Sequence, residues 1–235
     1  MRCLIAGLMT EFEPRYDETV KLAKPFEYEG ERETDISLSV SDEELENLQK
    51  KMVEGTTVGA TENFLLSSVF MRKAITRGVM LLHASALVVD GGAYLFSAQS
   101  GVGKSTHTRL WLSEFGDAVH ILNDDKPVLK IGGDSVTVCG TPFDGGSGIA
   151  LNESCPLRAI IFLERGERNS VSRPDKKRIL RELYFATAHR VGRVSAEAML
   201  DNFERLMALT EFYVLTCNME PEAAHVAYDA IIGSK

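Results

Sequence analysis

The sequence has little of what marks secreted, membrane-spanning or nucleic-acid-binding proteins. Its four cysteines are widely scattered and form no C-x-x-C pair, so we expect neither a disulfide framework nor a zinc site. No apolar run approaches the length of a membrane span. Lysine and arginine number 26 against 34 aspartates and glutamates, for a net charge of −8, whereas nucleic-acid binding needs a basic face. We therefore expect no nucleic-acid partner and no membrane association.

What remains is the composition of an ordinary globular protein. Hydrophobic residues make up 44% of the 235 residues and charged residues 26%. This length allows one sizeable core with a small additional N-terminal portion. The first nine residues, MRCLIAGLM, are too short and too soon followed by acidic residues for a secretory signal. Together with cysteines that we interpret as reduced thiols, this predicts a cytoplasmic protein.

Residues 1–78 predict a small α+β portion. Ser41 and Glu44 form the pattern of a capping box at the start of one helix, and Thr61 starts a second helix that Gly78 ends. Nothing in this part carries visible chemistry, so a structural or substrate-side role is the simplest interpretation. Weak alternation predicts three short strands, at Cys3–Leu8, Phe26–Tyr28 and Ile36–Val40.

The centre of the chain is organised around a glycine-bearing loop. Two apolar runs flank Asp90-Gly91-Gly92, which is typical of a hairpin turn. The order of strand, loop, G-K-S, helix, strand and paired acids is that of a phosphate-binding P-loop followed by a metal-binding acid. The predicted elements are strands at Val79–Val89 and Ala93–Ser97, a loop at Ala98–Gly103, a helix from Lys104 to about Phe115, and a strand at Ala118–Leu122 that ends at Asn123-Asp124-Asp125.

Each part of this loop has a physical reason to bind a nucleotide. Gly101 and Gly103 can adopt positive φ and let backbone N–H groups hold phosphate oxygens. Lys104 supplies a cation for the β and γ phosphates, and Ser105 a hydroxyl for Mg²⁺. Ala98 replaces the usual first glycine of the pattern, and a glycine-rich turn without a nucleotide is the alternative. The predicted nucleotide-binding residues are Ser100, Gly101, Val102, Gly103, Lys104, Ser105 and Thr106.

The spacing of these motifs carries a family resemblance. Lys104 and Asp124 lie only 20 positions apart, and His83 is predicted on the preceding strand. The ATP-dependent phosphoenolpyruvate carboxykinases carry H-C-S-A-N, S-G-T-G-K-T-T and G-D-D runs in the same order, and HPr kinases carry S-G-x-G-K-S followed by D-D. The chain resembles this superfamily over about residues 79–130. It is most similar to small bacterial HPr-kinase-related P-loop proteins of unknown substrate. The matching residues are His83-Ala84-Ser85-Ala86, Ser100-Gly101-Val102-Gly103-Lys104-Ser105-Thr106 and Asn123-Asp124-Asp125.

The resemblance implies a fold and roles for the acids. The expected fold class is α/β, with residues 79–235 forming a P-loop kinase core of the HPr kinase and carboxykinase type, a mixed sheet with hairpins. By resemblance to the carboxykinases, Asp125 is a metal ligand and Asp124 the catalytic base, although the reverse assignment fits the sequence nearly as well. His83 corresponds to a carboxykinase metal ligand, and a satisfied core histidine is the equally open alternative. On a continuous strand, His83 and Ser85 would share the face that points at the loop.

The leading functional hypothesis is a kinase that uses ATP, or another nucleoside triphosphate, with Mg²⁺ or alternatively Mn²⁺. Catalytic Lys104, Asp124 and His83 would transfer the γ-phosphoryl group to a hydroxyl of a protein, peptide or small molecule. The E-[IV]-R-G loop typical of HPr kinases is absent and the glycine-rich segment Gly140–Gly148 stands there, so phosphorolysis is not carried over. A nucleotide-binding sensor without turnover and an inactive scaffold are the alternatives. The sequence leaves the oligomeric state open, and the HPr kinases it resembles are oligomers.

Overall fold

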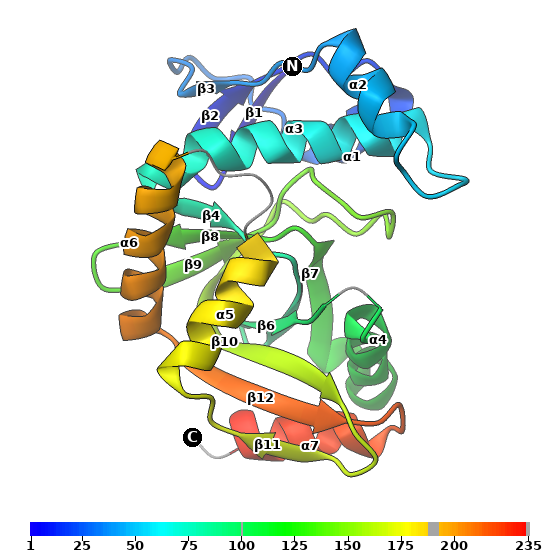
Figure 1. Ribbon diagram of the computed structural model, residues 1–235, viewed down its shortest axis with the longest axis vertical. Helices are drawn as coiled ribbons and strands as arrows, with labels where there is room; N and C mark the ends of the chain where they lie inside the picture. The colour runs from blue at the N-terminus through cyan, green and yellow to red at the C-terminus, as the bar shows by residue number, and fades with distance from the viewer. Residues whose placement is uncertain (100, 188–192, 234–235) are drawn as a thin grey trace.

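The computed structural model describes residues 1–99, 101–187 and 193–233 (Figure 1). It is a mixed α/β structure with a small sheet at the N-terminal end and a large curled sheet below it. The small sheet has the strand order β1-β2-β3. Its region contains β1 (Arg2–Ile5), β2 (Leu8–Glu11), α1 (Asp17–Ala23), η1 (Lys24–Phe26), β3 (Ile36–Ser37), α2 (Asp42–Gln49), α3 (Val58–Ala74) and η2 (Ile75–Arg77).

The large sheet has nine strands among the described residues, in the order β4-β8-β9-β10-β6-β5-β7, with β12 beside β10 and β11 beside β12. Its elements are β4 (Val79–Leu81), β5 (Ala84–Val89), β6 (Gly92–Ser97), α4 (Lys104–Phe115), η3 (Gly116–Ala118), β7 (Val119–Asp125), β8 (Val128–Ile131), β9 (Val136–Cys139), β10 (Ser154–Arg165), β11 (Ser170–Ser172), α5 (Lys176–Thr187), α6 (Arg193–Leu209), β12 (Glu211–Cys217) and α7 (Glu222–Ile231).

Strand β10 joins the two parts of this large sheet. Its first residues, Ser154–Pro156, pair antiparallel with β9, whereas the rest of the strand pairs in parallel with β6 and β12. The side chains of β10 alternate between two cores, because successive residues of a strand point to opposite faces. Ile160 and Phe162 pack in the core on the side of α5 and α6, and Ile161 packs in the core on the side of α4 and α7.

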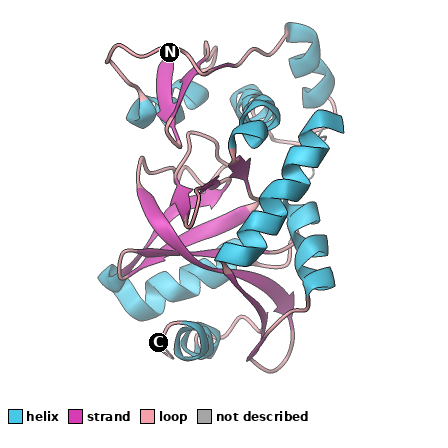
Figure 2. Cartoon of the chain, turned by 90° about the vertical axis from the view of Figure 1, so that its left-hand side faces the viewer, coloured by secondary structure: helices cyan, strands magenta, loops and turns pink. Residues whose placement is uncertain are grey.

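Helices therefore cover both faces of the large sheet, as Figure 2 also shows, and the two termini lie at opposite ends of the molecule. On one face, Leu183 of α5 and Phe203 of α6 are buried against the sheet. On the other, Trp111 of α4 is buried against Phe96 of β6. Burial of each such large apolar side chain stabilises the fold by about 1.5–3 kcal/mol. The second of these cores holds α4, the helix that follows the glycine-bearing loop.

The strand expected over Val79–Val89 is broken, and this is a correction. β4 pairs with β8, whereas β5 pairs with β6 and β7, so the chain changes partners at Leu82 and His83. The N–H of Leu82 donates to Pro127 O at 3.1 Å and that of His83 to Ala186 O at 2.9 Å. His83 consequently lies in a turn between two strands and not in the middle of one.

Other corrections concern weak local patterns. The expected strand Cys3–Leu8 is a hairpin of β1 and β2 that turns at Ala6 and Gly7, both with positive φ. Within the expected strand Phe26–Tyr28, Phe26 ends a short 3₁₀ helix and Glu27 makes an isolated bridge with Cys3. The capping box of Ser41 and Glu44 is confirmed, and the second helix, α3, begins at Val58 instead of Thr61, with Thr57 as its cap.

Candidate functional site

The loop at 98–103 joins β6 to α4. Gly101 and Gly103 have φ of +81° and +123°, which L side chains rarely adopt. A side chain at Gly101 would meet no atom within 4 Å, so glycine is needed there for its backbone conformation and not for lack of space. α4 begins at Lys104 without a side-chain cap, which leaves its first backbone N–H groups available to an anion. Thr106 is exposed on the first turn, and the predicted site residue Ser100 lies outside the described residues.

An arginine that the sequence did not single out holds this loop from outside. Arg165, at the end of β10, donates from Nε to Val102 O at 3.2 Å and from its terminal nitrogen to Gly101 O. Because the two carbonyls point toward Arg165, the loop conformation is tied to the end of the central strand. The local sequence gives no signal for this contact, since 63 and 64 positions separate the partners.

Lys104, His83 and Asp125 form a chain of polar contacts. Lys104 Nζ lies 2.7 Å from His83 Nε2, and His83 Nδ1 lies 2.9 Å from Asp125 Oδ1. A lysine ammonium can only donate, so Nε2 accepts and Nδ1 carries the proton that is donated to Asp125. The register of β5 with β7 pairs Ala84 with Asp125, which puts His83 beside that carboxylate. The expected placement of His83 next to the loop residues is confirmed, and its role as a metal ligand stays a prediction.

Asp125 has a strained backbone conformation and a carboxylate that His83 and Lys126 hold in place. Its φ is +150°, a region that costs a residue other than glycine about 1–3 kcal/mol. Besides His83, its carboxylate contacts the Lys126 ammonium at 3.2 Å. Burial by itself would raise the pKa of Asp125, but the hydrogen bond from His83 and the charge of Lys126 outweigh burial and lower it to about 2. Asp125 is therefore ionised at neutral pH.

Asp124 faces a different set of partners from its neighbour. Its Oδ1 accepts a hydrogen bond from Ser85, with which it is in register on β5, and a second one from Ser105 Oγ at 3.3 Å. Ser105 lies in the first turn of α4, so this carboxylate adjoins the start of the helix. The two acids thus point to different partners, as expected for adjacent residues of a strand. Asp124 contacts Ser105, and Asp125 contacts His83.

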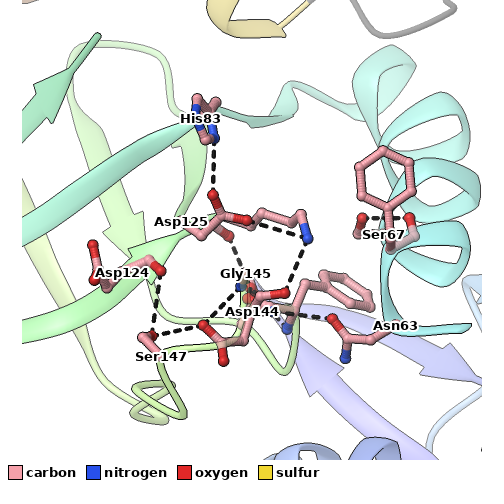
Figure 3. Close-up of polar contacts among 12 residues, drawn as sticks. Asn63, Ser67, His83, Asp124, Asp125, Asp144, Gly145 and Ser147 are labelled. Carbon is pink, nitrogen blue, oxygen red and sulfur yellow. Dashed lines mark hydrogen bonds and ion pairs between the residues drawn. The ribbon is translucent and has the colours of Figure 1, made fainter. Parts of the chain in front are cut away.

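The glycine-rich segment Gly140–Gly148 packs against both acids (Figure 3). The buried carboxylate of Asp144 accepts hydrogen bonds from Gly145 N, Ser147 Oγ and Gly148 N at 2.6–2.7 Å, which folds the segment around it. Asp144 and Asp125 form an isolated β-bridge, and Ser147 Oγ donates to Asp124 O at 3.4 Å. A side chain at Gly145 would lie 2.6 Å from Asp125 Cγ, so glycine is required there by the close approach.

The N-terminal portion, for which a structural or substrate-side role was expected, also reaches this site, through residues that the sequence did not single out. Asn63 of α3 is buried; its amide donates to Pro142 O at 2.8 Å and its oxygen accepts from Asp144 N at 3.0 Å (Figure 3). Lys126 Nζ donates to Asp144 O at 3.1 Å and lies 5.2 Å from the centre of the Phe64 ring. α3 therefore anchors the segment that supports the two acids. The only signal of this arrangement in the sequence is the high number of glycines in Gly140–Gly148.

A cavity of about 280 Å³ opens beside the acids. His83, Asp125 and Lys126 line part of it, together with Leu81 of β4 and side chains of α3 and of the last turn of α5. On the other side of His83, burial lowers the pKa of Lys104, although the charges of Asp125 and Asp124 act against this shift. The ammonium of Lys104 therefore lies where a second source of negative charge would stabilise it.

The described residues supply some of the ligands that a magnesium nucleotide needs. No group of three or more His, Cys, Asp or Glu side chains that could hold a metal occurs within residues 1–99, 101–187 and 193–233. Ser105 and Asp124 supply two oxygens, and Mg²⁺ in nucleotide sites commonly takes one or two protein ligands together with phosphates and water. Over the same described residues, no helix is long and apolar enough to cross a membrane.

Comparisons with known proteins give distant similarity at the level of structure. No family model matches the sequence, and no curated protein matches it. Among solved structures, the chain is similar to the HPr(Ser) kinase/phosphatase from Coxiella burnetii, with 13% sequence identity and a TM-score of 0.39; the match covers 66% of this chain and 98% of that one. At this level of similarity, function has to be argued from the geometry of the site.

Proposed function

We propose that the protein is a kinase that transfers the γ-phosphoryl group of a nucleoside triphosphate to a hydroxyl group. The observation that carries this proposal is that the two adjacent acids contact different partners. Asp124 contacts Ser105 at the start of α4, and Asp125 contacts His83 and Lys126 at the wall of a cavity. Phosphoryl transfer needs these two sites side by side, one for the metal nucleotide and one for the acceptor.

On the nucleotide side, the loop residues Gly101–Gly103 and the first N–H groups of α4 bind the phosphates. Lys104 binds the β and γ phosphates, and its lowered pKa is restored by their charge. Ser105 and Asp124, which lie within hydrogen-bond distance of each other, would hold the metal. When bound, Mg²⁺ neutralises charge that develops on the phosphate oxygens.

On the acceptor side, Asp125 is the base. The acceptor hydroxyl gives its proton to Asp125 as its oxygen forms a bond to the γ phosphorus, while the bond from that phosphorus to the β–γ bridging oxygen breaks and the nucleoside diphosphate leaves. His83 Nδ1–H and the Lys126 ammonium hold the carboxylate in place. This assignment is the reverse of the one that the carboxykinase resemblance implies. It is supported by the contact of Asp124 with Ser105 and by the position of Asp125 at the cavity.

Binding and turnover of a nucleotide test this proposal. The wild-type protein and Lys104→Ala would be titrated with Mg·ATP in a calorimeter and incubated with γ-labelled ATP and hydroxyl compounds. We expect binding that depends on Lys104, and label transfer or slow hydrolysis by the wild type. Binding without transfer or hydrolysis across a broad panel of acceptors would instead favour a nucleotide sensor. Absence of nucleotide binding would reject both functions.

A further inference from the structure

We propose that the cavity between α3, the β4–β5 turn and the end of α5 is the acceptor site, and that it takes a small uncharged alcohol. The inference rests on the proposed kinase function and specifies the substrate class. The cavity is placed for this task, because His83, Asp125 and Lys126 line part of it. The same His83 contacts Lys104 at 2.7 Å, so the cavity adjoins the lysine that is proposed to bind the phosphates.

The charges that line the cavity cancel. Lys126 and Asp125 form an ion pair at 3.2 Å, and the second hydrogen bond of the Lys126 ammonium goes to Asp144 O. Among the described residues, no other Asp, Glu, Lys or Arg lines the cavity. An anionic or cationic acceptor would therefore bring a charge into a half-enclosed space without a free counter-charge, which is costly. The lining selects against charged acceptors.

The remaining lining combines apolar surface with oxygen acceptors. Three hydroxyl groups lie there, and each donates its proton to a helix carbonyl: Ser67 and Ser68 to Phe64 O at 2.7 and 3.0 Å, and Thr187 to Leu183 O at 2.6 Å. Their lone pairs stay available, so the wall accepts hydrogen bonds and does not donate them. Phe64 and Met71 supply apolar contact. This lining matches a molecule that carries several hydroxyl protons on a carbon skeleton.

The size of the cavity argues for a whole small molecule. A volume of about 280 Å³ corresponds to roughly nine water molecules in the liquid, near the lower end of ligand pockets. The hydroxymethyl group of a single serine would fill only a small part of it and would leave most lining atoms without contacts. The acceptor is therefore expected to be a free polyol or monosaccharide in size, and not one side chain of a protein surface.

The test compares neutral acceptors with charged analogues of similar size. Glucose, glucuronate and glucosamine, with inositol and glycerol as further neutral alcohols and a serine-containing peptide, would be offered with Mg·ATP. Binding of each compound would also be followed by ligand-observed NMR, so that the site is measured even where transfer is slow. Thr187→Val removes one lining hydroxyl at nearly constant volume. Thr76→Val is the matched control, because that exposed threonine also bonds to a helix carbonyl but lies outside the cavity.

We expect at least one neutral alcohol to bind and to accept phosphate with a kcat/KM at least tenfold above its charged analogues. Thr187→Val should raise KM for that alcohol about three- to tenfold, leave the affinity for Mg·ATP unchanged and keep the melting temperature close to the wild type. Thr76→Val should change none of these. Preference for a charged sugar or the peptide, absence of any neutral binder, or equal effects of the two variants would overturn the inference. Nucleotide binding and hydrolysis by the wild type report separately on the kinase proposal.

Discussion

Replacement of Asp125 by asparagine is the most direct test of which of the two carboxylates, Asp124 or Asp125, acts as the base. Asparagine has nearly the same shape but cannot take up a proton from the acceptor, so the loss of turnover measures the base. General-base assistance contributes roughly 10²–10⁴-fold in rate, and we expect Asp125→Asn to lose at least 10²-fold in kcat. Its affinity for Mg·ATP should stay within about threefold of the wild type, because Ser105, Asp124 and Lys104 are retained.

The same substitution should also destabilise the folded protein, by an amount that follows from the lowered pKa of Asp125. The pKa of Asp125 is lowered from 3.8 to about 2, and one pKa unit corresponds to about 1.4 kcal/mol, so the charged form is favoured in the folded protein by about 2–3 kcal/mol. Removal of the charge should lower the melting temperature by several degrees, at about 2–4 °C per kcal/mol for a chain of this size. Assays at 20–25 °C therefore compare folded proteins.

Asp124→Asn is the matched variant, and the pair of results decides between the assignments. We expect it to lose Mg²⁺-dependent nucleotide affinity together with turnover, because it removes one of the two proposed metal ligands. Calorimetric titration with ATP, with and without Mg²⁺, measures the first effect and single-turnover transfer the second. If Asp124→Asn keeps its Mg·ATP affinity while Asp125→Asn loses it, the roles are exchanged and our interpretation of the contacts is wrong.

Three further predictions concern the loop, the close approach at the acids and acid pH. Lys104→Ala should weaken Mg·ATP binding at least tenfold, since charge-assisted hydrogen bonds contribute about 1.5–3 kcal/mol each; unchanged affinity in a calorimeter would reject the phosphate-binding loop. Gly145→Ala, which places a carbon 2.6 Å from Asp125 Cγ, should lower kcat about 10–100-fold, whereas Gly133→Ala, where the added carbon meets no atom within 4 Å, should leave kcat unchanged. Because the folded-state pKa of Asp125 is depressed, its contribution to stability is complete above about pH 4 and is lost as the pH falls toward 2. In denaturant titrations, the difference in unfolding free energy between wild type and Asp125→Asn should therefore shrink over that range. A constant difference would contradict the lowered pKa.

Local chemistry made much of the central region predictable. Asp90 and Gly91 form the expected hairpin turn, both with positive φ, between β5 and β6. Ser41 and Glu44 cap α2 as the sequence indicates. α4 begins at Lys104 and ends at Phe115, as predicted. In each case the residues that determine the structure lie within a few positions of one another, so the sequence pattern contains the whole cause.

Errors arose where the cause lies in the tertiary structure. The run Val79–Val89 is apolar throughout, so nothing local marks the point at which the chain leaves β8 and joins β6 and β7. The apolar Leu200 of α6 is 57% exposed, since the packing of α6 and not its periodicity decides which face is covered. The polar residues Ser170–Ser172 form β11 because β12 offers them an edge to pair with.

In the candidate site, too, features with a local cause could be predicted and features with a tertiary cause could not. The residues of the loop and the two acids could be named because their order along the chain matches a known chemistry. Asn63 and Asp144 could not, because their contact joins segments separated by 81 positions. Lys126 follows Asp125 directly, but its contacts with Asp144 and Phe64 also come from distant segments. Their chemistry is also unremarkable in isolation, since an amide, an ammonium and a carboxylate are common on any surface. Only their burial around Asp125 distinguishes them.

The strained conformation of Asp125 explains why the N-terminal portion is part of the site and not only a support beside it. A residue other than glycine keeps a φ of +150° only where its surroundings determine it from several sides. His83 and Lys126 hold the carboxylate, but the backbone is held through the bridge to Asp144, and the N–H of Asp144 in turn donates to Asn63 of α3. The same helix lines the proposed acceptor cavity with Phe64, Ser67 and Ser68. Any displacement of α3 by a bound acceptor would therefore act on the segment that bridges to the base, so acceptor binding and the position of Asp125 are mechanically linked.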